Sequence, residues 1–293
     1  MTPPAPGRDK RGERLPEETR LPEDADVLRR VENGVLWITL NRPEAGNAMK
    51  AEMRNQIAEW LDEASGDPTV RAIVITGSGE KGFCTGADLR GGRTQVAVRP
   101  EGVPDRIVGD AARMIRTGWQ RLVGSILDCE KPVIAGVNAT AAGGGMHLAL
   151  ACDLVIMAEE ARLIEVFVRR GIAPDAGGAY LLTRLVGPQK AKELFFFGDD
   201  VSATDAERIG IVNKVVPRAD LEKTLTEWAE RLARGPTKAI GFAKWLTNRS
   251  LDSDRHGAFW DEGYAQELTN QTEDAREGLT SFAERRPPEF KGW

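Results

Sequence analysis

The sequence predicts an α/β core that is followed by an all-helical C-terminal region. Up to about residue 217, strand patterns alternate with helical ones, which is typical of an α/β core. Beyond that point only helical periodicity is present. We therefore divide the chain into a core over 27–217 and a helical region over 218–293. Residues 1–26 offer almost nothing to bury, and we expect them to form a disordered tail.

The predicted core begins with a hairpin over 27–43, in which Asn33-Gly34 is the two-residue turn. An amphipathic helix follows over 50–65 and places four residues on its apolar face: Met53, Ile57, Leu61 and Ala64. Continuous apolar runs predict buried strands over 71–77, 131–138 and 153–160.

One long amphipathic helix is expected within the core, over 105–129. Its apolar stripe consists of Ile107, Ala111, Ile115, Leu122 and Ile126. The helical region should contain four helices, over 218–234, 236–250, 254–270 and 272–285.

Composition excludes several classes of function. The formal net charge of -5 makes general nucleic-acid binding a poor expectation, because such binding depends on Lys and Arg at phosphates. No apolar run reaches the roughly 18 residues of a membrane span, and the N-terminus lacks the apolar segment of a secretory signal. Three widely spaced cysteines favour a reduced cytoplasm over a disulfide framework or a zinc site. We expect no bound metal.

The glycine-rich segment "GSGEKG" over 77–82 fits a dinucleotide-binding pattern directly after a strand. That fingerprint requires the last glycine to lie in a helix that carries the pyrophosphate at its N-terminus. The residues that follow, "FCTGADL", have no helical period. A glycine-rich loop is therefore the better interpretation, and a nucleotide site is the alternative.

Two loops of small residues are better candidates for a binding site. In "AAGGGMHLALACDL", the glycines at 143–145 allow a ligand to approach the backbone, and a helix that starts there would direct free N–H groups at it. In "FCTGADL", over 83–89, a second such loop follows a strand. Two amides directed at one carbonyl oxygen would suit the oxyanion of a thioester or an enolate. Tight packing of helix on strand is the alternative explanation for the small residues.

Together these loops resemble the signature of the crotonase, or enoyl-CoA hydratase/isomerase, superfamily. The likeness continues in "LNRPEAGNAM", in "RRGIAPDAGGAYLLTRLVG" and in "DAREGLTSFAERRPPEF", so that four motifs in the family's order cover about residues 28–291. The resemblance implies a spiral of ββα turns, trimers that usually pair into hexamers, and acyl-CoA as substrate. Coenzyme A would be part of that substrate, with no permanently bound cofactor.

The resemblance also assigns roles to residues. The oxyanion hole would consist of the backbone N–H groups of Ala87 and Gly144. The CoA channel would be lined by Glu44, Ala45, Ala48, Asp88 and Leu89. A basic residue near the C-terminus, Arg285 or Lys291, would approach the CoA phosphates from a neighbouring helix or subunit, and a solvated tail is the alternative for both. The C-terminal helices would serve in trimerisation and as a lid on the CoA pocket.

The chain departs from the family's hydratases at the residues that activate water. Those enzymes resemble one another in carrying two glutamates, one as base and one as acid. At the corresponding positions this chain has His147 and Phe167. His147 should lie on the same helical face as Gly144, with a neutral imidazole, because a helix N-terminus disfavours the imidazolium. A merely packed histidine is the alternative.

Two carboxylates nearby are candidates for the missing chemistry. Asp175, in "APDAGG", matches a position where some non-hydratase members carry a working aspartate, although it also suits the N-cap of the next helix. Glu165 lies two residues before Phe167, so that a strand would direct both to one side. It would substitute for the missing glutamate or pair with Arg169 or Arg170.

The sequence thus predicts an acyl-CoA enzyme that stabilises a thioester enolate, as a non-standard hydratase or an isomerase. Two alternatives stay open. One is a hydrolase or a C–C bond-cleaving member of the same fold, in which His147 activates water and Asp175 completes the charge system. The other is a protein that binds acyl-CoA without turnover.

Overall fold

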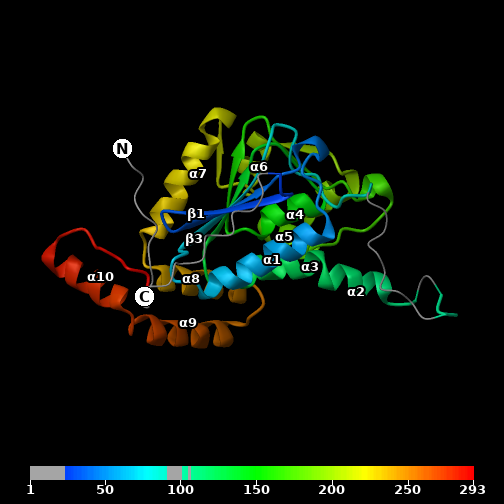
Figure 1. The fold of residues 1–293 in the computed structure, drawn as a ribbon. Coiled ribbons are helices and arrows are strands. Elements are labelled where there is room, and N and C mark those ends of the chain that lie inside the picture. The colour runs from blue at the N-terminus through cyan, green and yellow to red at the C-terminus, as the bar shows by residue number, and fades with distance from the viewer. Residues whose placement is uncertain (1–23, 91–100, 105–106) are drawn as a thin grey trace.

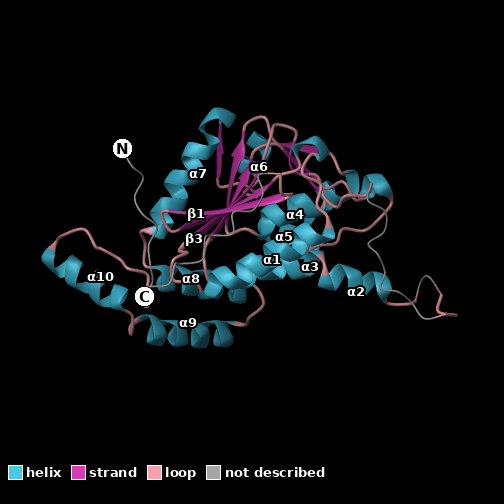
Figure 2. Cartoon of the chain, viewed as in Figure 1, coloured by secondary structure: helices cyan, strands magenta, loops and turns pink. Residues whose placement is uncertain are grey.

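The structure, a computed structural model, describes residues 24–90, 101–104 and 107–293. Strands lie at its centre and helices surround them (Figure 1, Figure 2). In the described part of the chain, no helix is long and apolar enough to cross a membrane. Most of the expected tail, residues 1–23, lies outside the described residues. Ala25 and Asp26 belong to the folded core, because their carbonyl groups accept hydrogen bonds from Asn41 at 3.0 and 2.8 Å.

The predicted hairpin is confirmed. β1 (Val27–Glu32) and β2 (Val35–Leu40) pair in antiparallel register around Asn33 and Gly34. These two turn residues have φ values of 52° and 76°. Positive φ at both central positions is the requirement of a type I′ turn, which Asn-Gly meets at low cost.

The hairpin is the edge of a six-stranded sheet with the order β1-β2-β3-β5-β7-β10, in which all pairs beyond the hairpin are parallel. The remaining strands are β3 (Ala72–Gly77), β5 (Val133–Val137), β7 (Leu154–Ala158) and β10 (Lys214–Val216). The three buried strands expected from apolar runs are thus confirmed. Helices cover this sheet, and its four central strands, β2, β3, β5 and β7, are buried along almost their whole length.

A second sheet of four short strands has the order β4-β6-β8-β9. Its members are β4 (Gly82–Cys84), β6 (Thr140–Ala142), β8 (Arg162–Ile164) and β9 (Asp200–Ser202). Each of β3, β5 and β7 in the large sheet is followed by a strand of the small sheet and then by helices. The chain therefore winds as a spiral of ββα turns, as the resemblance implied.

The helices of these turns form one layer, in which α1, α3, α4 and α5 contact one another in that order (Figure 1). Their bounds are α1 (Ala51–Gly66), α3 (Trp119–Asp128), α4 (Gly144–Ala151) and α5 (Gly178–Phe197), with a kink in α5 at Gly187. The predicted apolar face of α1 is buried, as expected. Two single-turn 3-10 helices, η1 (Pro43–Ala45) and η2 (Val168–Arg170), lie in the connections.

The prediction of a single long helix over 105–129 is wrong. Residues 105–106 lie outside the described residues, and the rest forms α2 (Asp110–Thr117) and α3, separated at Gly118. Gly118 has φ −103° and ψ −101°, which is not helical. The Arg54 guanidinium occupies the space where a Cβ of Gly118 would lie. Ile107 and Ala111 of the predicted stripe are consequently exposed, because α2 does not follow α3 into the core.

The C-terminal helices fall into two groups. α6 (Ala203–Arg208) precedes β10, and α7 (Arg218–Ala233) packs on the large sheet, where Leu225 lies against Gly136. Residue 217 is therefore the point after which only helices follow. It does not mark the end of the packed core, which includes α7. The later helices are α8 (Thr237–Ser250), α9 (Arg255–Thr269) and α10 (Glu273–Glu284), and the last two extend away from the sheets (Figure 1).

Candidate active site

The three glycines before His147 each have a separate steric reason. Gly143, the N-cap of α4, has φ 54° and ψ −125°, a conformation open only to glycine. A Cβ on Gly144 would lie 2.8 Å from the ring of Trp119, and a Cβ on Gly145 would clash with the carbonyl oxygen of Cys84. The helix N-terminus is thereby pressed against β4. Gly144 is the first residue of α4, and its N–H has no acceptor within the helix.

The second loop, after β4, lies beside this N-terminus. A Cβ on Gly86 would be 3.7 Å from the Gly144 nitrogen. Met49 holds the loop by donating to the Gly86 oxygen at 2.8 Å and accepting from the Asp88 nitrogen at 3.0 Å. These two hydrogen bonds flank Ala87 and do not use its N–H. The structure thus brings the Ala87 and Gly144 loops together, as the sequence predicted, at the positive end of a helix dipole.

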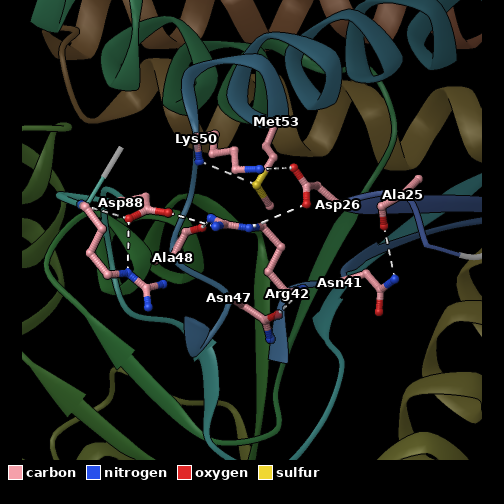
Figure 3. Close-up of polar contacts among 10 residues, drawn as sticks. Ala25, Asp26, Asn41, Arg42, Asn47, Ala48, Lys50, Met53 and Asp88 are labelled. Carbon is pink, nitrogen blue, oxygen red and sulfur yellow. Dashed lines mark hydrogen bonds and ion pairs between the residues drawn. The ribbon is translucent and has the colours of Figure 1, made fainter. Parts of the chain in front are cut away.

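An arginine that the sequence reasoning missed joins the expected CoA-channel segments (Figure 3). Arg42 donates to the Ala48 carbonyl at 2.6 Å and forms a 2.8 Å ion pair with Asp88. Asp26 lies 3.5 Å from the same guanidinium. The Arg90 backbone N–H, followed by Arg42, holds the pKa of Asp88 below its ordinary value. Arg42 therefore fixes the early loop to the residue next to Ala87.

The other expected channel residues lie on the surface around this pair. Glu44 and Leu89 are exposed, and Ala45 is half-buried in η1. The only signal for Arg42 in the sequence was its place in "NRP", where its partner could not be identified.

The glycine-rich segment after β3 is a loop, and the dinucleotide alternative is wrong. Gly82 begins β4, so that the helix which the fingerprint requires is replaced by a strand. The fully buried Asn47 holds the loop by donating to the carbonyl groups of Ser78 and Gly82 at 3.0 and 2.7 Å. A Cβ on Gly82 would clash with the Gly46 carbonyl. These glycines allow close packing of two loops.

His147 and Glu165 form a buried pair behind the two amides. The Nε2 of His147 lies 2.9 and 3.1 Å from the two carboxyl oxygens of Glu165, and the side chains are 0% and 1% exposed. The ring of Phe167 stacks on the imidazole, with 5.2 Å between the centroids. In the described part of the chain, His147 Nδ1 has no hydrogen-bond partner. The α carbon of Gly178 covers the same ring, because a Cβ there would clash with Nε2.

Glu165 has a partner that the sequence did not predict. It lies just after β8 and, with Phe167, reaches the same imidazole. Pairing of Glu165 with Arg169 is wrong, because the Arg169 guanidinium forms a 2.8 Å ion pair with Asp200 on β9. A fully buried imidazole whose donor is already used by a carboxylate has limited access to a substrate.

Asp175 lies in the connection between η2 and α5, and its expected alternative role as N-cap is wrong. The N-cap of α5 is Gly177, with φ 77°, and its helix has no side-chain cap. Asp175 contributes only its carbonyl, which accepts from the Gly178 nitrogen at 3.1 Å. Burial raises the pKa of the Asp175 carboxyl, while the nearby His147 and Arg54 act in the opposite direction. Its side chain is thus half-buried beside the site and is not used by the helix.

The two basic candidates near the C-terminus lie elsewhere in the chain. Arg285 is the exposed C-cap of α10, with φ 56°, and Lys291 is exposed in the segment that follows. The backbone N–H of Lys291 donates to the carboxylate of Asp274 at 2.6 Å. α10 lies at the left edge of the molecule in Figure 1, away from α4, which is near the centre. Within the described residues, no cluster of three or more His, Cys, Asp or Glu could hold a metal ion.

Known proteins are similar to this chain over most of its length. A family model described as "Enoyl-CoA hydratase/isomerase" matches residues 30–293. The chain is 36% identical to the 1,2-epoxyphenylacetyl-CoA isomerase of Escherichia coli, over 91% of this chain and 98% of that protein. It is 35% identical to the short-chain-enoyl-CoA hydratase of Clostridium acetobutylicum, over 89% of this chain and 95% of that protein.

Solved structures agree. The crystal structure of an enoyl-CoA hydratase from Bacillus anthracis superposes with a TM-score of 0.81 and 34% identity, covering 92% of this chain and all of that one. An enoyl-CoA hydratase/isomerase from Cupriavidus metallidurans gives a TM-score of 0.82 and 32% identity, over 93% and 98% of the two chains. These similarities confirm the predicted α/β, crotonase-like fold.

Proposed function

The chain belongs to the enoyl-CoA hydratase/isomerase family, and we propose that it holds the enolate of an acyl-CoA thioester between the N–H groups of Ala87 and Gly144. Two preorganised amides at a helix N-terminus stabilise negative charge as it develops on a carbonyl oxygen. The adjacency of the two loops supports this assignment. Coenzyme A enters as part of the substrate, and the catalysis needs no permanently bound cofactor.

The reaction we propose is isomerisation of an unsaturated acyl-CoA by a proton shift. The carboxylate of Asp175 removes a proton from the α carbon, and the electron pair delocalises onto the thioester oxygen. The same carboxyl then returns the proton to the γ carbon, and the double bond moves next to the thioester. No atom is gained or lost.

The observation that carries this choice is the number of available carboxyl groups. Hydration needs one group to activate water and another to deliver a proton. Of the two acids predicted from the sequence, Glu165 is occupied by His147, which leaves Asp175. One carboxyl with a raised pKa suits a proton that leaves and returns. In this proposal His147 and Glu165 shape the floor of the site without contacting substrate.

We further propose that coenzyme A lies along Glu44, Ala45, Ala48, Asp88 and Leu89, and that Arg285 or Lys291 of a neighbouring subunit approaches its phosphates. The distance between α10 and α4 within one chain supports a contribution from a second subunit. Large apolar side chains exposed on α9 and α10 support a homotrimer or hexamer, in which the C-terminal helices also cover the CoA pocket: Phe259, Trp260, Tyr264, Leu279 and Phe282. Three buried, unpaired cysteines support a cytoplasmic enzyme.

The test is to incubate the protein with 3-hexenoyl-CoA in D₂O and to follow the products by mass spectrometry. We expect 2-hexenoyl-CoA to accumulate well before any 3-hydroxyhexanoyl-CoA. Rapid hydration of 2-hexenoyl-CoA would show a hydratase, and release of free CoA would show a hydrolase. Binding without any turnover would show an acyl-CoA-binding protein. Each of these three results would overturn the proposal.

A further inference from the structure

Arg54 on α1 lies next to the candidate site but has no role in the scheme above. Its guanidinium packs over the ring of Trp119, with Cζ 5.7 Å from the ring centroid. It also lies against the backbone between α2 and α3, because a Cβ on Gly118 would be 2.9 Å from both Cζ and Nη2 of Arg54 and 2.7 Å from the Met114 carbonyl oxygen. The guanidinium is thus packed between the Trp119 ring and the backbone at Gly118.

Among the residues that the structure describes, none accepts a hydrogen bond from the Arg54 guanidinium. Its Nε is buried and, within the described residues, has no acceptor. In that same part of the chain no carboxylate lies within ion-pair distance of its guanidinium, and Glu52 and Asp175 influence it only at longer range. Burial lowers its pKa, although a guanidinium stays protonated. Since a buried donor without an acceptor is costly, such a group is a candidate for binding a ligand.

The position of Arg54 relative to the two amides identifies which part of a ligand it would meet. Atoms of the Trp119 ring lie 2.8 Å from where a Cβ of Gly144 would be. Arg54 lies against this same ring and close enough to Asp175 for their charges to interact. Because Asp175 meets the reacting carbons in the proposed function, an acyl group of a thioester held at Gly144 extends toward Trp119, Asp175 and Arg54.

We propose that Arg54 selects acyl groups that carry an oxygen acceptor, a carbonyl or a carboxylate, beyond the reacting carbons. A guanidinium offers several N–H donors in a fixed fork, and oxygen acceptors are the groups that it binds best. A plain hydrocarbon chain would offer no acceptor to the two Nη nitrogens, which are not among the buried donors. The inference rests on the proposed function for the placement of the thioester.

Three saturated thioesters of nearly equal size test the proposal: hexanoyl-CoA, 5-oxohexanoyl-CoA and glutaryl-CoA. They present at the same place a methylene, a neutral carbonyl and a carboxylate. Calorimetry should show that the two oxygen-bearing ligands bind the wild-type protein about 10- to 100-fold more tightly than hexanoyl-CoA, the range of a charge-assisted hydrogen bond. The Arg54→Met variant should bring this ratio close to one. The relative affinity of the keto and carboxylate ligands then identifies which acceptor is preferred.

The matched control is Arg121→Met, because Arg121 lies on the exposed side of α3, 3.9 Å from Asp62. It should keep the wild-type preference. Wild-type affinities within threefold of one another, or a preference that survives in Arg54→Met, would overturn the proposal. Arg54→Gln provides a second variant if Arg54→Met does not fold. None of the ligands has a double bond to move, so a protein that fails as an isomerase can still show this preference.

Discussion

Two carboxyl groups lie close to the second turn of α4, and they differ in what surrounds them. Both oxygens of Glu165 lie within 3.1 Å of one imidazole nitrogen, and the residue is 2% exposed. Asp175 is half-buried, and in the described part of the chain its side chain has no ion pair. Burial without a partner is what raises a carboxyl pKa, whereas a partner consumes the group. A candidate catalyst thus differs from a structural pair in having no partner for its carboxyl group, rather than in how deeply that group is buried.

Replacing the available acid should have the largest effect. In Asp175→Asn we expect kcat for 3-hexenoyl-CoA isomerisation to fall by about 10²- to 10⁴-fold, the usual contribution of an acid/base group. KM should change little, since the amides and CoA contacts remain. Asp199→Asn, an exposed aspartate in the connection to β9, is the control. A variant that retains a tenth of the wild-type kcat would show that Asp175 does not transfer the proton.

Removing the occupied acid should act on folding instead. Glu165→Ala should lower the free energy of unfolding by about 3–5 kcal/mol, because a buried imidazole loses its partner. Urea denaturation measures this loss. The double variant Glu165→Leu, His147→Leu should recover part of it, because both polar groups are then absent. If Glu165→Ala is as stable as wild type but inactive, Glu165 rather than Asp175 is the chemical group.

The pH dependence of stability tests the environment of Asp175. Burial raises the folded-state pKa of Asp175 above the ordinary value of 3.8, so the folded protein favours the neutral carboxyl more than the unfolded chain does. The stability this contributes is fully present below the unfolded-state pKa and is lost as pH rises through the folded-state pKa. Asp175→Asn should therefore be more stable than wild type near pH 7, with the difference disappearing below about pH 4. Urea titrations across this range would contradict the assignment if the difference were constant.

An exposed pair provides the smallest effect and a reference for the buried one. Asp200 accepts from Arg169 at 2.8 Å and from Arg162 at 3.3 Å, at the surface of the small sheet. Asp200→Asn should cost no more than about 1 kcal/mol, because solvent screens such pairs. The same urea assay measures it, and added salt should reduce it further. If Asp200→Asn lowered the free energy of unfolding as much as Glu165→Ala does, burial would not determine how much these ion pairs contribute to stability.

What the sequence could predict was decided by short-range patterns. The hairpin, the buried strands and the two loops of small residues follow from residues that are close in the chain, so they were predictable. The partner of His147 is Glu165, 18 residues away and in another turn of the spiral, and the sequence did not predict that these two residues pair. Arg42 was missed because its role depends on Asp88, 46 positions later, which no local periodicity reports.

Two predictions failed because a distant residue overrode a local preference. The pattern over 105–129 favours one helix, yet Gly118 has a non-helical backbone, against which the guanidinium of Arg54 packs. Aspartate is favoured at N-caps, yet Gly177 adopts φ 77° and starts α5 two residues later than Asp175 suggests. Both departures lie at the candidate site, where local consistency is expected to be weakest.

The contact between Gly178 and His147 also constrains the order in which this site can change. A side chain at position 178 would clash with the imidazole of His147, so it becomes possible only after that ring has been replaced by something smaller. The reverse order passes through a variant with two groups in one place. Substitutions that reshape this part of the site, in evolution or in the laboratory, must therefore occur in a fixed order, beginning at position 147.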